Sequence, residues 1–311
     1  MLAWTLLLAA CTTWAEPPAP PPDPPPAPAP PPAVVRALPE ADGWTALEEG
    51  LDLGVFTAPV ASTHGDSRIT VLRADPERFE PVLLMASAEA ERGEAATKRT
   101  ARAWAERYGL VAAINTSMFR DDHRSATHYL AGPLDPRVEG SPTHVNQGDD
   151  ASGNTMLVFD PVDPSRDPPL KIVDRKCGQS FAEAHARYRA RVQSIRMVSC
   201  HGGSVWAQQP KQWSHAVVGV DKAGRLLFIH ARSPWSTHDF IDLLLGLPID
   251  LAQLQYAEGG PEASLWVDAG GREVELFGSY ETGFNENDDN RRAWPLPNVL
   301  GLRPVPGSEP R

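Results

Sequence analysis

Alternating apolar and polar residues recur along the chain from about Leu51 onward. The runs SRITVLR over Ser67–Arg73 and FEPVLLM over Phe79–Met85 have the period of two that predicts strands. The short apolar run Leu110–Ile114 predicts a buried strand that ends at Asn115. Further strands are predicted over Asn154–Asp160, Lys171–Asp174, Ser194–Met197 and Leu254–Ala257.

Helical spacing interrupts the strand pattern. Helices are predicted over Glu89–Tyr108, Phe181–Val192 and Asp239–Leu245, with Thr237 as an N-cap and Pro248 at the start of a further short helix. The chain therefore mixes strands with a few helices.

One hairpin is visible in the pattern. The apolar runs Ser214–Val220 and Arg225–His230 flank the turn residues Asp221–Gly224. These two runs are expected to pair as neighbouring antiparallel strands.

The first residues resemble an export signal. Met1–Ala10 is an apolar run of signal length, too short to span a bilayer as a mature helix. One alternative places cleavage before Cys11, because the preceding Leu-Ala-Ala resembles a bacterial lipobox in which the cysteine is lipidated. The other places it after Ala15, behind a small residue at Thr13. The protein is expected to be exported to the periplasm or cell surface, with a lipoprotein anchor as the favoured alternative.

Residues 16–33 are rich in proline, which lacks the backbone donor of a helix or ladder. As polyproline II, at about 3.1 Å per residue, this linker would reach roughly 50 Å. Such a length suits a stalk between a membrane anchor and a folded part.

Composition narrows the classes of partner. Apolar residues make up 41% of the 311 residues, enough for a sizeable core. The net charge is −11 and the basic residues are scattered, so the sequence predicts no nucleic-acid binding. A small molecule or a glycan is the expected partner.

Two cysteines remain after signal processing, Cys177 and Cys200. In an exported chain an even number of cysteines favours a disulfide between them. The alternative is that Cys200 is a nucleophile beside His201, but neighbours in sequence do not establish that spatial pair.

The stretch Arg120–Gly153 has no periodicity and is expected to be a long loop. It contains candidate metal ligands at Asp121, Asp122, His123, His128 and His144. No pair has the spacing of a familiar structural zinc site, so no metal or other cofactor is assigned. A metal-dependent hydrolase built on this loop is retained as a third alternative.

Three elements resemble those of the phosphodiester glycosidase family. Asn115 ends a strand, although Thr116–Ser117 stand where the family usually has glycines. The hairpin around Val218–Gly224 resembles a second family element. The strand end Tyr256–Gly260, followed by Ser264, is similar to the family's LDGGgS motif, with glutamate in place of the usual aspartate.

The resemblance extends from about Val71 to Val267. It implies an α+β fold, a single mixed-sheet domain with a few flanking helices over residues 51–303, followed by a loose tail at 304–311. It also implies a hydrolase that releases a sugar from a sugar-1-phosphodiester or a related envelope glycan. A surface lipoprotein that binds a glycan phosphate without cleaving it is the alternative.

The implied chemistry assigns roles to particular residues. Glu258 would activate water or stabilise positive charge near the anomeric carbon, and Arg196 would bind the phosphate through its planar guanidinium. Asn115 would hold a hydroxyl or a phosphate oxygen. The alternatives are a structural ion pair for Arg196, a cap on the turn after its own strand for Asn115, and for Glu258 a strand-end carboxylate held by backbone N–H groups. Substrate contacts are expected from Gly259, Gly260, Ser264, Thr116, His201 and Ser214.

Overall fold

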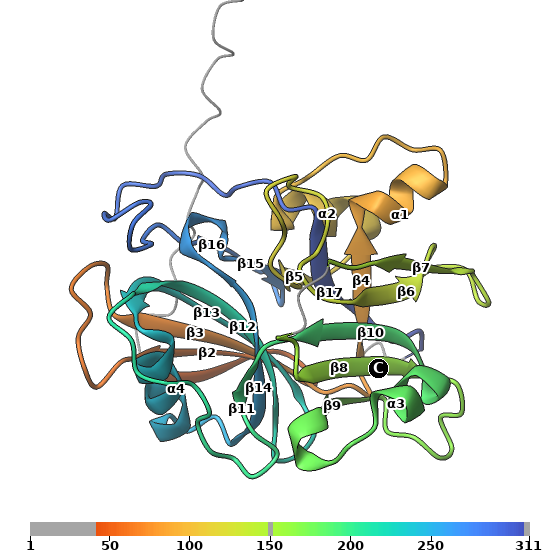
Figure 1. Ribbon diagram of the computed structural model, residues 1–311, viewed down its shortest axis with the longest axis horizontal. Helices are drawn as coiled ribbons and strands as arrows, with labels where there is room; N and C mark the ends of the chain where they lie inside the picture. Colours follow the sequence, from red (N-terminus) through yellow and green to blue (C-terminus); the bar gives the residue numbers. More distant parts are fainter. Residues whose placement is uncertain (1–41, 149–151, 308–311) are drawn as a thin grey trace, which may run out of the picture. The chain divides into compact units, whose positions relative to one another are not determined.

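A computed structural model describes residues 42–148 and 152–307, and Figure 1 shows their arrangement in three sheets. The export signal, Cys11 and the proline-rich linker lie outside the described residues. The seven-stranded sheet I has the order β1 (Gly43–Glu48), β2 (Leu51–Thr57), β3 (Arg68–Ala74), β13 (Leu226–Trp235), β12 (Trp213–Asp221), β14 (Leu251–Gly259) and β11 (Arg196–Val198).

Two five-stranded sheets complete the fold. Sheet II has the order β16 (Arg272–Phe277), β15 (Ser264–Ala269), β5 (Ala112–Asn115), β17 (Asn298–Pro304) and β4 (Phe79–Met85). Sheet III has the order β7 (Thr143–Asn146), β6 (Leu130–Pro133), β10 (Tyr188–Ser194), β8 (Thr155–Pro161) and β9 (Leu170–Asp174).

The expectation that the sheet is mixed, with parallel and antiparallel strands, is wrong. All strand pairs of the three sheets are antiparallel within residues 42–148 and 152–307. Neighbours such as β12 and β13 are joined by a tight turn, whereas parallel neighbours need a crossover of about a dozen residues. The fold is rich in sheet, and its helices are short.

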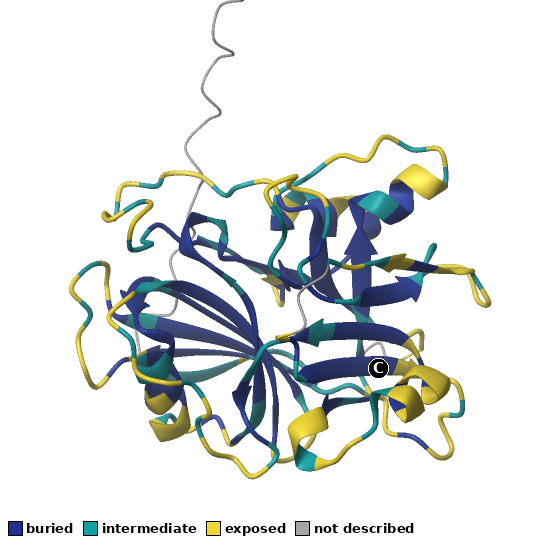
Figure 2. Ribbon diagram, viewed as in Figure 1, coloured by how far each residue is buried: buried dark blue, intermediate teal, exposed yellow. Residues whose placement is uncertain are grey.

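A central core lies where the three sheets face one another. Leu72 of sheet I, Ile114 of sheet II and Leu157 of sheet III belong to this one buried cluster. Each sheet turns its other face to one helix, as Figure 2 shows by the dark strands beneath partly exposed helices. Sheet I packs on α4 (Thr237–Gly246), sheet II on α2 (Ala101–Tyr108) and sheet III on α3 (Phe181–Arg187). Both faces of every sheet are therefore covered.

The strand predictions agree well with the structure. β4 has the predicted bounds, and β3 is displaced by one residue. The predicted hairpin is β12 and β13, and Asp221 closes its turn by accepting hydrogen bonds from the backbone N–H groups of Ala223 and Arg225, each at 2.9 Å. β1 extends the folded part to residues before Leu51.

Two helix predictions are wrong in extent. The segment Glu89–Tyr108 is split into α1 (Ala86–Glu91) and α2, because Gly93 adopts a φ of +80° and the chain leaves the helix there. The segment Phe181–Val192 ends its helix at Arg187. The residues from Tyr188 onward form β10, whose side chains point alternately to the two faces of sheet III, and they pair with β8. Strand pairing therefore overrides the helical composition of this segment.

Two details near α4 also differ. The N-cap is Ser236 and not Thr237, since the Ser236 hydroxyl accepts a hydrogen bond from the N–H of Asp239 at 3.1 Å. No helix follows Pro248, because the chain enters β14 at Leu251. The predicted long loop after Arg120 contains the short strands β6 and β7.

The predicted disulfide between Cys177 and Cys200 is confirmed, with Cα atoms 6.5 Å apart. It joins the 3-10 turn Arg175–Cys177 after β9 to the segment after β11. Sheets I and III are therefore covalently linked at this edge. None of the helices within the described residues is long and apolar enough to cross a membrane.

Candidate active site

Glu258 lies near the end of β14, in a row of residues that crosses sheet I. Its Cα pairs with that of Ala216 on β12, which in turn pairs with His230 on β13. The Glu258 carboxylate accepts a hydrogen bond from the N–H of Gly259 at 3.0 Å, and the side chain is partly exposed. Glu258 is thus a half-buried residue at a strand end of sheet I.

The two glycines after Glu258 are required by neighbouring side chains. A Cβ on Gly259 would clash with the Tyr256 hydroxyl and approach Trp213 Cδ1 at 2.7 Å. A Cβ on Gly260 would clash with the Glu281 carboxylate, and Gly260 has a φ of +66°. The glycine pair therefore lets protein side chains close over the strand end, and its contact with a substrate stays a prediction.

Three glutamates converge at this point, and we call Glu258, Glu262 and Glu281 the carboxylate cluster. Glu262 lies in the 3-10 turn Gly260–Glu262 that follows β14, and Glu281 follows β16. Burial raises the pKa of Glu258 well above its usual value. The Gly259 N–H opposes that rise, whereas the charges of Glu262 and Glu281 increase it. Burial and the two acidic neighbours therefore both favour the protonated form of Glu258.

The pKa values of Glu262 and Glu281 are raised as well. Burial raises the pKa of Glu262 to about 7, with a further rise from Glu281 and an opposing effect of Lys98. Burial also raises the pKa of Glu281, and Lys211 opposes that rise. Two lysines are therefore near enough to the cluster to act on its charges.

The raised pKa of Glu262 makes stability depend on pH. The folded state binds a proton on Glu262 between the ordinary glutamate pKa of 4.5 and about 7, whereas the unfolded state does not. Stability therefore falls as the pH rises through this window. We expect Glu262→Gln to raise the free energy of unfolding at pH 8 by on the order of 1 kcal/mol, with little change at pH 4.

Urea unfolding of both proteins at pH 4, 6 and 8 measures this dependence. Asp268→Asn, an exposed carboxylate on β15, is the control and should follow the parent at every pH. Equal destabilisation of Glu262→Gln at pH 4 and pH 8 would contradict the assignment.

Asn115 holds the turn that carries Glu262. Its Nδ2 donates to the Glu262 carbonyl oxygen at 3.0 Å, and its Oδ1 accepts from the N–H of Ser264 at 2.7 Å. The Ser264 hydroxyl donates to the same carbonyl oxygen at 3.0 Å. Asn115 and Ser264 are thus positioning residues for the Gly260–Ser264 segment. Asn115 thus holds a distant turn and not the turn after its own strand, and direct substrate contact by either residue stays a prediction.

Two further side chains hold neighbouring parts of the site: one contacts Ala263, and the other supports the segment that leads to Glu281. His230 Nε2 lies 3.3 Å from the Ala263 carbonyl oxygen, which also accepts from the N–H of Gly278 at 2.7 Å. Burial lowers the pKa of His230 to about 3, so the ring is neutral. Ser214 accepts from the backbone N–H groups of Ser279 and Tyr280 at 3.0 and 3.2 Å. Ser214 therefore supports the segment leading to Glu281.

Arg196 on β11 lies opposite Gln255 on β14. Gln255 precedes Glu258 by three residues on that strand. Its Nη1 is 3.2 Å from the carboxylate of Asp174, which is completely buried. That carboxylate also accepts from the N–H of Cys200 at 3.3 Å. Arg196 thus forms the structural ion pair that the sequence left open, and its phosphate role stays a prediction.

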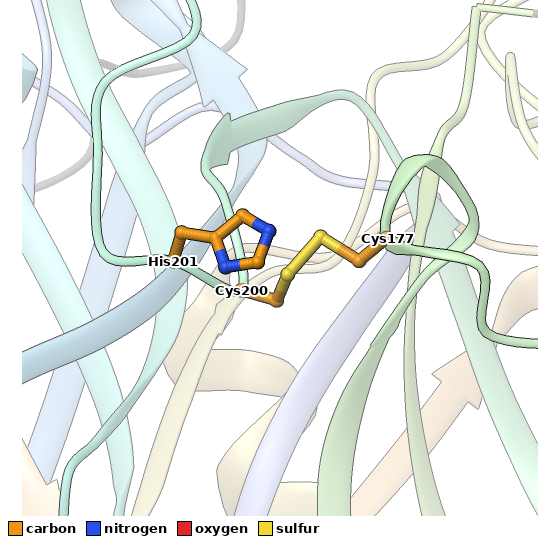
Figure 3. Close-up of side chains that lie close together, drawn as sticks. All are labelled: Cys177, Cys200 and His201. Carbon is orange, nitrogen blue, oxygen red and sulfur yellow. A yellow bond between two sulfur atoms is a disulfide. The ribbon is translucent and has the colours of Figure 1, made fainter.

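His201 and Thr116 lie apart from these contacts. Figure 3 shows the His201 ring beside the Cys177–Cys200 disulfide, and the residue is exposed. Cys177, Cys200 and His201 form the one group in the described part of the chain whose possible metal-ligand atoms all lie within 4.8 Å of one another, but the two sulfurs are bonded to each other. Thr116 is buried, and its hydroxyl has no hydrogen-bond partner among the described residues.

The candidate ligands of the Asp121–His144 loop are separated in the structure. His144 Nε2 contacts the Ser87 hydroxyl at 2.8 Å, and its Nδ1 lies 2.8 Å from Glu91. His128 Nε2 contacts the Ser152 hydroxyl at 3.0 Å. Both histidines bind local partners of sheet III and α1.

Sequence patterns did not identify several residues of this site. Glu262 was visible only as part of an insertion between the glycines and Ser264. Glu281, Lys98, Lys211 and Trp213 belong to no motif, and they reach the site through long-range pairing of the strands. Their distance along the chain from Glu258 explains why no local signal marked them.

Comparison with known proteins identifies the class. Residues 108–303 match the phosphodiester glycosidase family, so the chain belongs to that family and the resemblance predicted from the sequence is confirmed. No curated protein matches the chain significantly.

Solved structures with a similar fold are distant in sequence. One is the catalytic domain of zebrafish N-acetylglucosamine-1-phosphodiester alpha-N-acetylglucosaminidase, auto-inhibited by its pro-peptide. The TM-score is 0.55 at 10% identity, covering 85% of this chain and 87% of that one. Another is a hypothetical protein from Synechocystis, with a TM-score of 0.50 at 11% identity, covering 85% of this chain and 64% of that one. These likenesses establish the fold.

Proposed function

We propose that this chain is an exported hydrolase that releases a sugar from a sugar-1-phosphodiester, or from a related envelope glycan, at the carboxylate cluster. The observation that carries the proposal is the convergence of three partly exposed glutamates with raised pKa values on one strand end of a phosphodiester glycosidase fold. Groups of this kind, placed where substrate can reach them, are typical of acid–base catalysis.

The reaction sets simple demands on the site. Water adds to the anomeric carbon, the bond from that carbon to the phosphate oxygen breaks, and the phosphate departs as a monoester. Because that leaving group is a weak base, it needs no proton from the protein. The site must instead take a proton from the water and stabilise the phosphate and the positive charge that develops on the sugar.

Glu262 suits the role of base, since a pKa of about 7 gives it both the ionised form and useful basicity near neutral pH. Burial favours the protonated form of Glu258, which would donate a hydrogen bond to a phosphate oxygen without charge repulsion. Lys98 and Lys211 would balance the phosphate charge. In these roles Glu262 accepts a proton from water, and Glu258 donates a hydrogen bond to the phosphate.

Two further facts support the substrate class and the location. The zebrafish protein of similar fold is named for action on an N-acetylglucosamine-1-phosphodiester. The Cys177–Cys200 disulfide is of the kind that persists in oxidising compartments, which supports export. The lipid anchor at Cys11 remains part of the proposal.

The test is release of free sugar from a panel of sugar-1-phosphodiesters, with and without a chelator. Release by the parent supports the hydrolase, and loss of release with the chelator would move the mechanism to a metal-dependent one. Saturable binding without release would replace the enzyme by a glycan-phosphate-binding surface protein.

Variants of Glu258 test its role as donor in the same assay. Glu258→Gln keeps a hydrogen-bond donor, so we expect it to retain release within about tenfold, whereas Glu258→Ala should lose about 10²-fold or more. Equal, near-complete loss in both variants would show that Glu258 acts in its ionised form. Release unchanged in both would remove Glu258 from the mechanism.

A further inference from the structure

A small cavity opens beside the carboxylate cluster. Its volume is about 180 Å³, below the range of sites that enclose a drug-sized ligand, so it suits one ring-sized group. It is lined by Pro261, Phe284, Asn285, Asp289, Asn290 and Trp294.

The wall of this cavity is built by the segment between β16 and β17, residues 278–297, which is tied to sheet I. Arg232 on β13 donates to the Asp288 carboxylate at 2.6 Å and to the Asn290 carbonyl oxygen at 2.9 Å. Asn290 Nδ2 donates to the Gly278 carbonyl oxygen at 2.7 Å. The cavity is therefore preformed by buried and half-buried contacts, a feature of ligand sites.

The cavity and the carboxylate cluster share the same two segments. Pro261, which lines the cavity, lies between Gly260 and the proposed base Glu262. The Glu281 carbonyl oxygen accepts from the N–H groups of Phe284 at 3.1 Å and Asn285 at 3.0 Å. The cavity is thus built by the same two chain segments that carry Glu262 and Glu281.

The lining combines aromatic rings with polar acceptors. Phe284 is 63% exposed, and its ring meets that of Trp294 edge to face at 6.3 Å. The Asp289 carboxylate has no hydrogen bond or ion pair with any described residue, so its oxygens are available to a ligand. The Asn290 Oδ1 has only long contacts, at 3.4 Å, to the N–H of Arg292 and to Trp294 Nε1.

We propose that this cavity is the subsite for one neutral pyranose ring of the substrate, an inference that rests on the proposed function. A pyranose has an apolar C–H face, which would pack on Phe284 and Trp294, and peripheral hydroxyls, which would donate to Asp289 and Asn290. The Asp289 carboxylate disfavours a phosphate in this cavity. A wholly apolar group would make no hydrogen bond with Asp289 or with the half-buried Asn290.

The test measures binding of the neutral methyl glycosides of glucose, galactose, mannose and N-acetylglucosamine by saturation-transfer NMR. None of these probes contains phosphate, so binding does not depend on the hydrolysis reaction. We expect at least one glycoside to bind the parent and Phe284→Ala, Trp294→Ala and Asp289→Ala to weaken it about tenfold or more. Phe284→Tyr, which keeps the ring, should stay within about threefold of the parent.

Phe181→Ala, an aromatic residue at the start of α3 on sheet III, is the matched control and should bind as the parent does. Absence of binding by all four glycosides, or parent-like binding by the three alanine variants, would overturn the subsite. Failure of sugar release with glycoside binding intact would contradict the proposed reaction and leave the subsite standing.

Discussion

Replacing Glu262 by glutamine is expected to lower kcat for sugar release by about 10²–10⁴-fold, because the variant cannot take the proton of the attacking water. In the parent, kcat/KM should rise with pH through about 7 as Glu262 ionises. The residual activity of Glu262→Gln should lack this step. Steady-state kinetics between pH 5 and pH 9 measure both effects.

The same substitution should stabilise the fold at pH 8, so a loss of activity there cannot be attributed to unfolding. The matched control is Glu275→Gln on β16. Burial also raises the pKa of Glu275, and the charge that opposes this rise is that of Arg102 on α2. Glu275→Gln should keep the parent kcat and the parent pH profile. A Glu262→Gln variant with the parent pH profile would assign the base to another group.

Replacing Asn115 by alanine is the second large expected effect. It would leave the buried N–H of Ser264 unpaired and remove one partner of the Glu262 carbonyl oxygen, at a cost of about 1–3 kcal/mol in the free energy of unfolding. Because the same bonds place Glu262, kcat should also fall by about 10²-fold. Urea unfolding and kinetics on the same samples measure the two effects.

Asn298 provides a matched control for Asn115. It is a buried asparagine on β17, the strand that pairs with β5, and its side-chain amide has no hydrogen-bond partner among the described residues. We expect Asn298→Ala to retain the parent kcat and to be destabilised by less than Asn115→Ala. A parent-like kcat in folded Asn115→Ala would show that the Gly260–Ser264 segment places Glu262 without Asn115.

The division of roles within the cluster follows from differences in environment. Burial raises the pKa of all three glutamates. A lysine opposes this rise at Glu262 and at Glu281, but not at Glu258. Glu258 instead has one backbone N–H and two acidic neighbours. Identical side chains can therefore serve as donor and acceptor at the same pH, since their environments separate their pKa values.

Local patterns were sufficient for much of the sheet. The sequence predicted β3, β4 and the β12–β13 hairpin, because each has apolar residues at a period of two or an apolar run bounded by turn residues. This combination is typical of strands. The segments Glu89–Tyr108 and Phe181–Val192 were misjudged, since helical composition does not exclude a break at Gly93 or pairing with β8.

By itself the sequence determined the family, the disulfide partners and the position of Glu258 beside two glycines, because each depends on residue type and order. Only the tertiary structure decided the rest of the site. The turn after β14 places Glu262, and the antiparallel bridge between Trp213 and Glu281 places Glu281, near the strand end that carries Glu258, and burial raises the pKa values of all three. The tertiary structure also places Arg196 in an ion pair with Asp174. Proximity and desolvation depend on how distant segments pack, and a linear pattern carries neither.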